Sequence, residues 1–160
     1  MADVYRLTGE LNDGHDLYPA ADNAPKDLVA TRRRLARMVG LDERDGTSQD
    51  WLEFARAWRG HQVDELGGQL HRVMAAHGLS PETPYVSAGC GDFLAADVAA
   101  RARSLAGADV AKPFDGGHAY GTDVARLAPG AQAEAASVRS WAQVCAPCVA
   151  VAALLHAEQP

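Results

Sequence analysis

The stretch Thr83-Pro84-Tyr85-Val86-Ser87-Ala88-Gly89-Cys90-Gly91-Asp92-Phe93-Leu94 decides the fold class of this chain. It predicts a short strand over 85–88 and a helix over 92–105, joined by a turn that holds two glycines. Such a turn can take positive φ and leaves no Cβ in the way, while the N–H groups of the helix face a ligand. Ser87, Gly89 and Gly91 are therefore candidates for binding a nucleotide or a phosphate. The alternative is a tight strand-to-helix turn that binds nothing, because short glycine motifs often match by chance.

The remainder of the C-terminal half extends this pattern. A second strand is predicted over 108–112, ended by Pro113, so that strand, glycine turn, helix and strand follow in a βαβ order typical of α/β packing. A loop over 114–118 and a helical stretch to about Leu127 come next. Two further helices are predicted, over 132–144 and from Pro147 to Leu155, where proline suits a first helical turn.

The N-terminal half predicts three helices, over 1–11, 25–39 and about 50–77. The second has Leu28, Leu35 and Met38 on its expected inner face, and the third is the longest of the chain. Thr47 and Asp50 form a capping box at its start. We therefore expect one domain over 1–160, with a helical part over 1–79 and an α/β part over 80–160.

Composition limits the classes of function. The chain has 160 residues and a formal net charge of −6, which argues against a non-specific nucleic-acid binder. No apolar run approaches the roughly 20 residues of a membrane span, and the N-terminus lacks the pattern of a signal peptide. A cytoplasmic protein is expected. The one basic cluster is Arg32-Arg33-Arg34 with Arg37, which on an amphipathic helix predicts a solvated face, with a phosphate patch as the alternative.

The cysteine pair at Cys145 and Cys148 has the Cys-x-x-Cys spacing of a redox motif. A thioredoxin-like pair, however, follows a strand and opens a polar turn. Here the pair leads into an apolar helix, so we interpret the cysteines as buried packing residues that are dispensable for chemistry. The spacing of Cys90, His118 and His156 does not indicate a fourth ligand for zinc.

Polar residues in the loop over 12–24 form another candidate site. Asp16, Asp22 and the neighbouring Lys26 could together hold a metal–phosphate group, with the lysine as a point charge. The alternative is a polar surface loop without a ligand. Lys26 stands out because the chain has only one other lysine, Lys112.

Several motifs occur here in the same order as in one known family. They are Ala2-Asp3-Val4-Tyr5-Arg6-Leu7-Thr8-Gly9-Glu10-Leu11, the Asp16…Pro19…Ala21-Asp22…Lys26 loop, Leu35-Ala36-Arg37-Met38-Val39-Gly40, Val86-Ser87-Ala88-Gly89, and Cys145-Ala146-Pro147 with Val149-Ala150-Val151-Ala152. Over nearly its whole length the chain resembles the hydantoinase/oxoprolinase-like proteins of the tetrahydromethanopterin-linked one-carbon transfer pathway. These belong to the actin-like and sugar-kinase-like ATPase superfamily.

The resemblance implies a helix-rich, ribonuclease-H-like domain with a small sheet, the C-terminal one of a two-domain fold. It implies a transferase of methanofuran-type cofactor biosynthesis, which joins an aminomethylfuran diphosphate to a glutamyl-tyramine acceptor. Asp3, Asp22 and Lys26 match polar positions of the family and are its implied catalytic residues, while Ser87, Gly89 and Gly91 match the turn that meets the nucleotide. Mg²⁺ and ATP or a diphosphate-bearing substrate are the implied cofactors, although no metal ligand is identified.

The chain also departs from the family. Family members are about twice as long and begin with a domain carrying an Asp-x-Gly-Gly phosphate loop, which Phe114-Asp115-Gly116-Gly117 comes too late to replace. Met1, Tyr18 and Ala20 stand where the family has Thr, His and Thr. We therefore expect a C-terminal portion that associates with itself or with a partner supplying the other domain. Two functions stay open, an enzyme portion that binds a phosphorylated small molecule and a non-catalytic binding or partner module.

Overall fold

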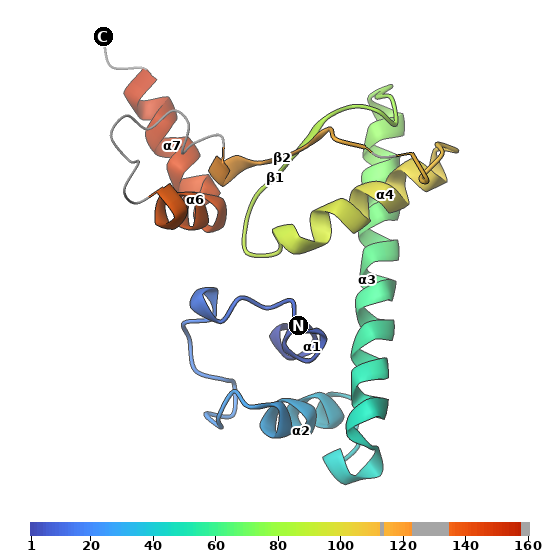
Figure 1. Cartoon of the computed structure of the whole chain (residues 1–160), viewed down its shortest axis with the longest axis vertical. Coiled ribbons are helices and arrows are strands. Elements are labelled where there is room, and N and C mark those ends of the chain that lie inside the picture. The colour runs from blue at the N-terminus through green and yellow to red at the C-terminus, as the bar shows by residue number, and fades with distance from the viewer. Residues whose placement is uncertain (113, 123–134, 158–160) are drawn as a thin grey trace. The chain divides into compact units, whose positions relative to one another are not determined.

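The structure, a computed structural model, describes residues 1–112, 114–122 and 135–157 (Figure 1). Its elements in chain order, with η marking a 3₁₀ helix, are α1 (Ala2–Thr8), η1 (Asp13–His15), α2 (Leu28–Met38), η2 (Glu43–Asp45), α3 (Ser48–Ala76), β1 (Tyr85–Ser87), η3 (Asp92–Leu94), α4 (Ala95–Leu105), β2 (Gly117–Ala119), α6 (Ala135–Val144) and α7 (Ala146–Ala157). The chain is rich in helix and carries one small parallel sheet. In this general sense the predicted α/β class is confirmed.

Two compact units divide the chain, Met1–Glu65 and Leu66–Pro160. The division falls inside α3, so this helix contributes its first part to one unit and its last part to the other. The sequence instead predicts a change of character at residue 80, where the long helix has ended.

The core of the Met1–Glu65 unit lies between α1 and α2, where Val4 and Leu35 are completely buried. The inner face of α2 is formed by Ala30, Thr31, Arg34, Leu35 and Ala36. Leu28 and Met38, which the sequence predicts on that face, are 53% and 54% exposed. The prediction is confirmed for Leu35 and wrong for Leu28 and Met38, because the rest of the buried face of α2 is made of small residues and the buried Arg34.

Helix α3 begins with the predicted capping box. The backbone N–H of Thr47 donates to Asp50 Oδ2 at 2.8 Å, and the N–H of Asp50 donates to Thr47 Oγ1 at 3.2 Å. One turn later Trp51 is buried and donates from Nε1 to the carbonyl of Glu43 at 2.8 Å. This bond fastens the start of α3 to η2, which precedes it in the chain.

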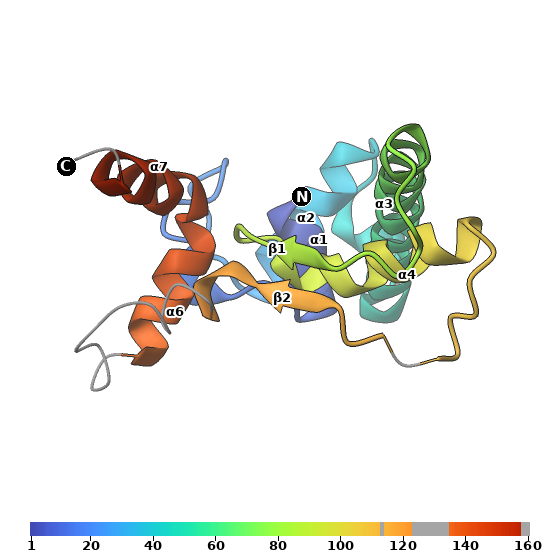
Figure 2. The ribbon, with the colours of Figure 1, turned by 90° about the horizontal axis from the view of Figure 1, so that it is seen from above.

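The sheet of the Leu66–Pro160 unit pairs β1 with β2 in parallel, with Val86 opposite His118 (Figure 2). The predicted first strand is confirmed, but the second strand is Gly117–Ala119 and not 108–112. The segment 108–112 is a turn because its backbone bonds are made locally. The N–H of Ala108 donates to the carbonyl of Arg103, and the N–H of Ala111 donates to the side chain of Asp109.

Between the strands, η3 and α4 together cover the predicted helix over 92–105. Helix α4 meets α3 at Gly67, where an added Cβ would lie 2.6 Å from Cβ of Arg101. Glycine at this position therefore permits the close approach of the two helices. The order strand, turn, helix, strand is retained, with a longer connection into β2 than the sequence predicts.

Helices α6 and α7 confirm the last two predicted helices, with Pro147 as the second residue of α7. Residues 132–134, and the predicted helical stretch beyond Thr122, lie outside the described residues. Cys148 is exposed and Cys145 is partly exposed, so the prediction of buried cysteines is wrong. The face of α7 that carries Cys148 and Val151 is not covered by described residues.

None of the described helices is long and apolar enough to span a bilayer.

Candidate functional site

Arg34 lies at the centre of a group of charged side chains in the Met1–Glu65 unit. Its Nε lies 3.0 Å from both carboxylate oxygens of Asp3, and its Nη2 lies 2.8 Å from Oδ1 of the same residue. Its Nη1 donates to Asp22 Oδ1 at 3.3 Å. The Arg34 side chain is only 8% exposed, so these carboxylates offset the cost of burying its charge. Asp3 and Asp22, two predicted catalytic residues, are thus brought together by an arginine.

Arg6 and Lys26 extend this group. Arg6 donates from Nη1 to Asp3 Oδ1 at 2.9 Å and from Nη2 to the carboxylate of Asp16. Lys26 Nζ lies 2.9 Å from Asp16 Oδ2 and donates to the carbonyl of Asp16 at 2.5 Å. The third predicted catalytic residue is therefore connected to Asp3 through Asp16 and Arg6. We call the six side chains the charged cluster: Asp3, Arg6, Asp16, Asp22, Lys26 and Arg34.

A cavity of about 240 Å³ opens at the charged cluster, beside the loop residues Pro19, Ala20 and Ala21. Its lining includes three cationic side chains, of Arg6, Lys26 and Arg34, but only two carboxylates, of Asp3 and Asp16. Asp22 borders an adjoining cavity of about 270 Å³, which shares Asp3 and Arg34 with the first. The six side chains of the charged cluster balance three positive against three negative charges, but the cavity brings Arg6, Lys26 and Arg34 together, and these three can bind an anionic ligand.

Hydrogen bonds shift the pKa values of Asp16, Asp22 and Arg34 in the cluster. The hydrogen bond from Lys26 lowers the pKa of Asp16, and the hydrogen bond from the Ala24 N–H, followed by that from Arg34, lowers the pKa of Asp22. Hydrogen bonds to Asp3 in turn raise the pKa of Arg34. Asp16 and Asp22 therefore stay ionised at neutral pH. They can hold cations in position, but they are unsuited to donate a proton.

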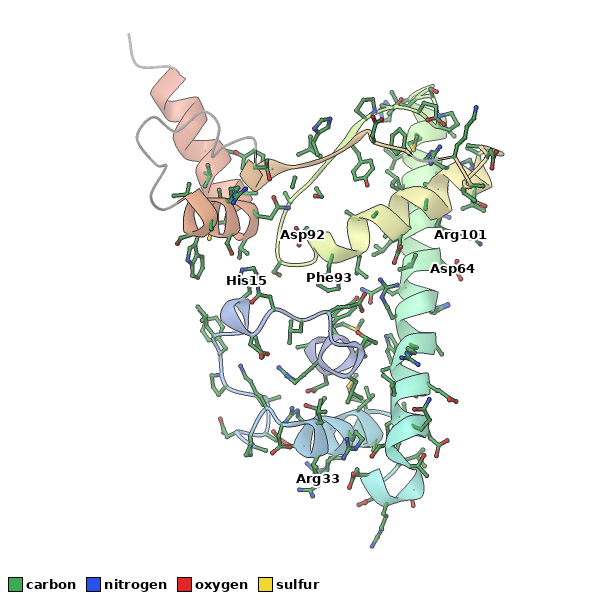
Figure 3. All side chains as sticks on the ribbon, in the orientation of Figure 1. His15, Arg33, Asp64, Asp92, Phe93 and Arg101 are labelled. Atoms are coloured by element: carbon green, nitrogen blue, oxygen red, sulfur yellow. The ribbon has the colours of Figure 1, made fainter. Side chains whose placement is uncertain are left out.

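Some basic residues of α2 face the solvent, whereas Arg34 belongs to the charged cluster. Arg33 is exposed and projects from the side of α2 opposite α1 (Figure 3). Arg37 is 61% exposed and lies 3.7 Å from Asp22, and Arg32 pairs with Glu43 at 3.2 Å. The predicted solvated face holds for Arg33 and Arg37, but it is wrong for the buried Arg34 and for Arg32, whose side chain is only 13% exposed. Helical spacing could have indicated this, because Arg34 follows Thr31 by three residues and precedes Leu35, both on the buried face.

The turn after β1 belongs to the Leu66–Pro160 unit. Gly89 has a φ of +95°, which explains the need for glycine there. Its N–H donates to the backbone carbonyl of Gln143 in α6 at 2.7 Å, and Gln143 Nε2 donates to the carbonyl of Ser87 at 2.9 Å. A phosphate that used the Gly89 N–H would have to displace the Gln143 carbonyl.

Gly91 and the short helix that follows give less support for an anion at this turn. Gly91 has a φ of −100°, and nothing lies within 4 Å of the position that a Cβ would take on it. The N–H of Asp92 donates to the carbonyl of Gly89 at 3.3 Å. Asp92 and Phe93 mark the beginning of this helical segment (Figure 3), and the Asp92 carboxylate in its first turn would repel a phosphate.

The described residues contain no group of three or more His, Cys, Asp or Glu side chains placed to hold a metal ion. In the charged cluster, Asp3 and Asp16 both pair with Arg6, and Asp3 also pairs with Arg34. A divalent cation would have to displace these guanidinium groups, so the cluster fits an anion better than a free metal ion.

Comparisons of the chain with models of protein families, with curated proteins and with solved structures found no match. What the chain does is therefore inferred from its side chains, together with the resemblance in its motifs.

Proposed function

We propose that the cavity at the charged cluster binds the diphosphate group of a phosphorylated small molecule. The observation that carries this proposal is that three cationic side chains, those of Arg6, Lys26 and Arg34, line one cavity. Guanidinium groups bind phosphate oxygens through paired N–H donors, and lysine acts as a point charge. At about 240 Å³ the cavity is below the roughly 300–1,000 Å³ of typical ligand pockets, so it suits a diphosphate rather than a whole nucleotide.

Together with the family resemblance, this cavity supports a role as part of a transferase of methanofuran-type cofactor biosynthesis with a ribonuclease-H-like, ATPase-related fold. The reaction would join an aminomethylfuran diphosphate to a glutamyl-tyramine acceptor and release pyrophosphate. Arg6 and Lys26 would hold the departing diphosphate, whereas Asp3 and Asp22 would orient Arg34. Magnesium belongs to this proposal only as a counter-ion of the diphosphate, since the carboxylates of the cluster already hold cations.

A non-catalytic binding module is the second candidate. The observation in its favour is the ion pairing of the predicted catalytic residues. Arg6 and Arg34 hold the carboxylate of Asp3, and Lys26 is paired with Asp16. A module of this kind would bind the same phosphorylated molecule without turning it over.

Calorimetric titration of pyrophosphate into the 160-residue chain tests the binding site. Because the chain has two lysines, one in each unit, Lys26→Gln has a natural control in Lys112→Gln. We expect Lys26→Gln to weaken pyrophosphate binding about tenfold, the equivalent of about 1.4 kcal/mol, and Lys112→Gln to leave it unchanged. No binding to the wild type, or equal binding to wild type and Lys26→Gln, would rule out the cavity as the site.

Two further measurements separate the alternatives. If Gly89→Val abolishes pyrophosphate binding while Lys26→Gln does not, the phosphate belongs to the turn at Ser87, Gly89 and Gly91. Pyrophosphate release on mixing the chain with both proposed substrates supports the transferase. Intact pyrophosphate binding without release supports the binding module.

A further inference from the structure

A second candidate binding site lies wholly within the Leu66–Pro160 unit and is independent of the charged cluster. Two cavities, of about 90 and 270 Å³, share Tyr85, Ala99, Arg103 and Phe114 in their linings. The smaller continues among apolar side chains of α3 and the following loop, including Leu70, Met74 and Leu79. The larger reaches Lys112. The two cavities therefore meet at these residues; the smaller is lined mainly by apolar side chains, and the larger also includes Lys112.

The rings of Tyr85 and Phe114 stack with centroids 6.1 Å apart and an interplanar angle of 28°. Arg103 lies over the Phe114 ring, with Cζ 4.5 Å from its centroid. Tyr85 comes from β1, Arg103 from α4 and Phe114 from the segment before β2. Aromatic faces arranged in this way favour a planar apolar ligand, because rings stack on one another in offset geometry.

Arg103 supplies the polar feature of the site. Its side chain is 6% exposed, and its Nη2 donates to Glu82 Oε1 at 2.9 Å. Its Nε is buried and has no hydrogen-bond partner among the described residues. Buried donors are nearly always paired, so an unpaired donor in a residue lining two cavities points to an acceptor that a ligand supplies.

The cationic residues of the two linings indicate which kind of acceptor the ligand supplies. Arg103 lines both cavities and Lys112 the larger one, and neither lining includes Asp or Glu, since Glu82, the partner of Arg103 Nη2, lies outside both linings. Arginine favours planar, bidentate acceptors, of which a carboxylate is the simplest. We propose that this site binds a small aromatic carboxylate, with its ring against Tyr85 and Phe114 and its carboxylate at Arg103 and Lys112. Because the site lies apart from the charged cluster in sequence and composition, the proposal does not depend on the diphosphate cavity.

Benzoate is the probe for this site, and benzyl alcohol is its neutral counterpart. Binding to the full chain is measured by ligand-observed NMR, and shifts of the backbone amides of Val110, Ala111 and Lys112 locate the ligand. We expect benzoate to bind, to shift those amides, and to bind more tightly than benzyl alcohol. Absence of benzoate binding, or equal affinity for the two probes, would overturn the proposal.

Three variants assign the contacts. Lys112→Gln, at an exposed position, should weaken benzoate binding up to about fivefold. Phe114→Leu should weaken it about threefold to tenfold through loss of ring stacking. Arg103→Lys keeps the charge but loses the planar fork, and should weaken benzoate binding by about tenfold. Circular dichroism identifies any variant that fails to fold.

Lys26→Gln is the matched control for benzoate, just as Lys112→Gln is for pyrophosphate. The two lysine variants should therefore show opposite effects with the two probes. If Lys26→Gln weakens benzoate binding as much as Lys112→Gln does, the benzoate site is not the one at Phe114. Suppose that pyrophosphate does not bind, but that Lys112→Gln weakens benzoate binding and Lys26→Gln does not. The proposed function would then be contradicted, and the benzoate site would stand.

Discussion

Arg34 of α2 forms a side-on ion pair with Asp3 of α1. Its Nε lies 3.0 Å from both carboxylate oxygens, and its Nη2 lies 2.8 Å from one of them. This pair joins the two helices that form the core of the Met1–Glu65 unit. Removing the arginine would leave Asp3 partly buried with less than its full set of donors. Such a loss is more costly than the net contribution of the pair itself.

We therefore expect Arg34→Met to lower the free energy of unfolding by about 3 kcal/mol, near the lower end for a broken buried ion pair. Urea denaturation followed by circular dichroism measures this change. Arg33→Met is the control, because the neighbouring Arg33 is exposed, and it should change stability by less than about 0.5 kcal/mol. Similar effects of the two substitutions would show that the ion pair adds little to the core.

The charged cluster should also make the protein sensitive to acid. Asp16 and Asp22 have lowered pKa values in the folded state, so the unfolded chain binds more protons than the folded chain as the pH falls. Their contribution to stability is complete above the ordinary aspartate pKa of about 3.9 and is lost as the pH falls through their folded values.

Denaturation curves between about pH 6 and pH 2, a range that brackets the ordinary aspartate pKa, test this prediction. Wild-type stability should fall with acidification, and Asp22→Asn should be less stable at neutral pH but lose less stability in acid. Asp115→Asn, at an exposed position, should follow the wild-type curve. If Asp22→Asn and the wild type show the same dependence of stability on pH, the acid sensitivity comes from other carboxylates.

Local sequence signals predict the helices and the first strand well. The capping box of Thr47 and Asp50 involves residues three apart, and its two hydrogen bonds form as expected. The second strand depends on pairing with residues about thirty positions away. Gly117-His118-Ala119 has little intrinsic preference for a strand, whereas the more apolar segment 108–112 is held in a turn by Asp109.

The candidate site was predictable only in part. The resemblance and the polar loop indicated Asp3, Asp22 and Lys26, which the structure connects in one cluster. It was the role of Arg34 that escaped prediction, because an arginine on a helix is normally solvated and its carboxylate partner lies 31 positions away. The sequence also does not indicate the site at Arg103 and Phe114, because its residues come from three segments that lie far apart in the chain.

The adjacent glycines Gly67 and Gly68 in α3 should respond oppositely to substitution. A Cβ on Gly67 would lie 2.5 Å from Cγ and 2.6 Å from Cβ of Arg101, near the backbone of α4. Gly67→Ala should therefore force α3 and α4 apart and destabilise the protein by about 1–3 kcal/mol, as other overpacked sites do. A Cβ on Gly68 would have nothing within 4 Å, so Gly68→Ala should stabilise the protein by about 0.5–1 kcal/mol.

Thermal denaturation distinguishes the two variants of α3. Equal shifts in melting temperature would mean that α3 and α4 do not meet at Gly67.

Gln143 connects α6 to both strand ends of the sheet. The residue is 8% exposed, and its side chain donates to the carbonyl of Ser87 at 2.9 Å and accepts from the N–H of Gly121 at 2.7 Å. Gln143→Leu removes both bonds and leaves these backbone groups without partners, so we expect a loss of about 2 kcal/mol in unfolding free energy.

Hydrogen exchange of the Gly121 amide separates the two bonds of Gln143. Gln143→Leu should accelerate this exchange, because the amide loses its acceptor. Gln143→Glu retains a carboxylate oxygen for the Gly121 N–H but no longer donates to Ser87, so the amide should stay slow although stability still falls. Fast exchange in both variants would mean that docking of α6, rather than the single bond from Gly121, protects the amide. Unchanged exchange in Gln143→Leu would show that this bond is not what holds the end of β2 against α6.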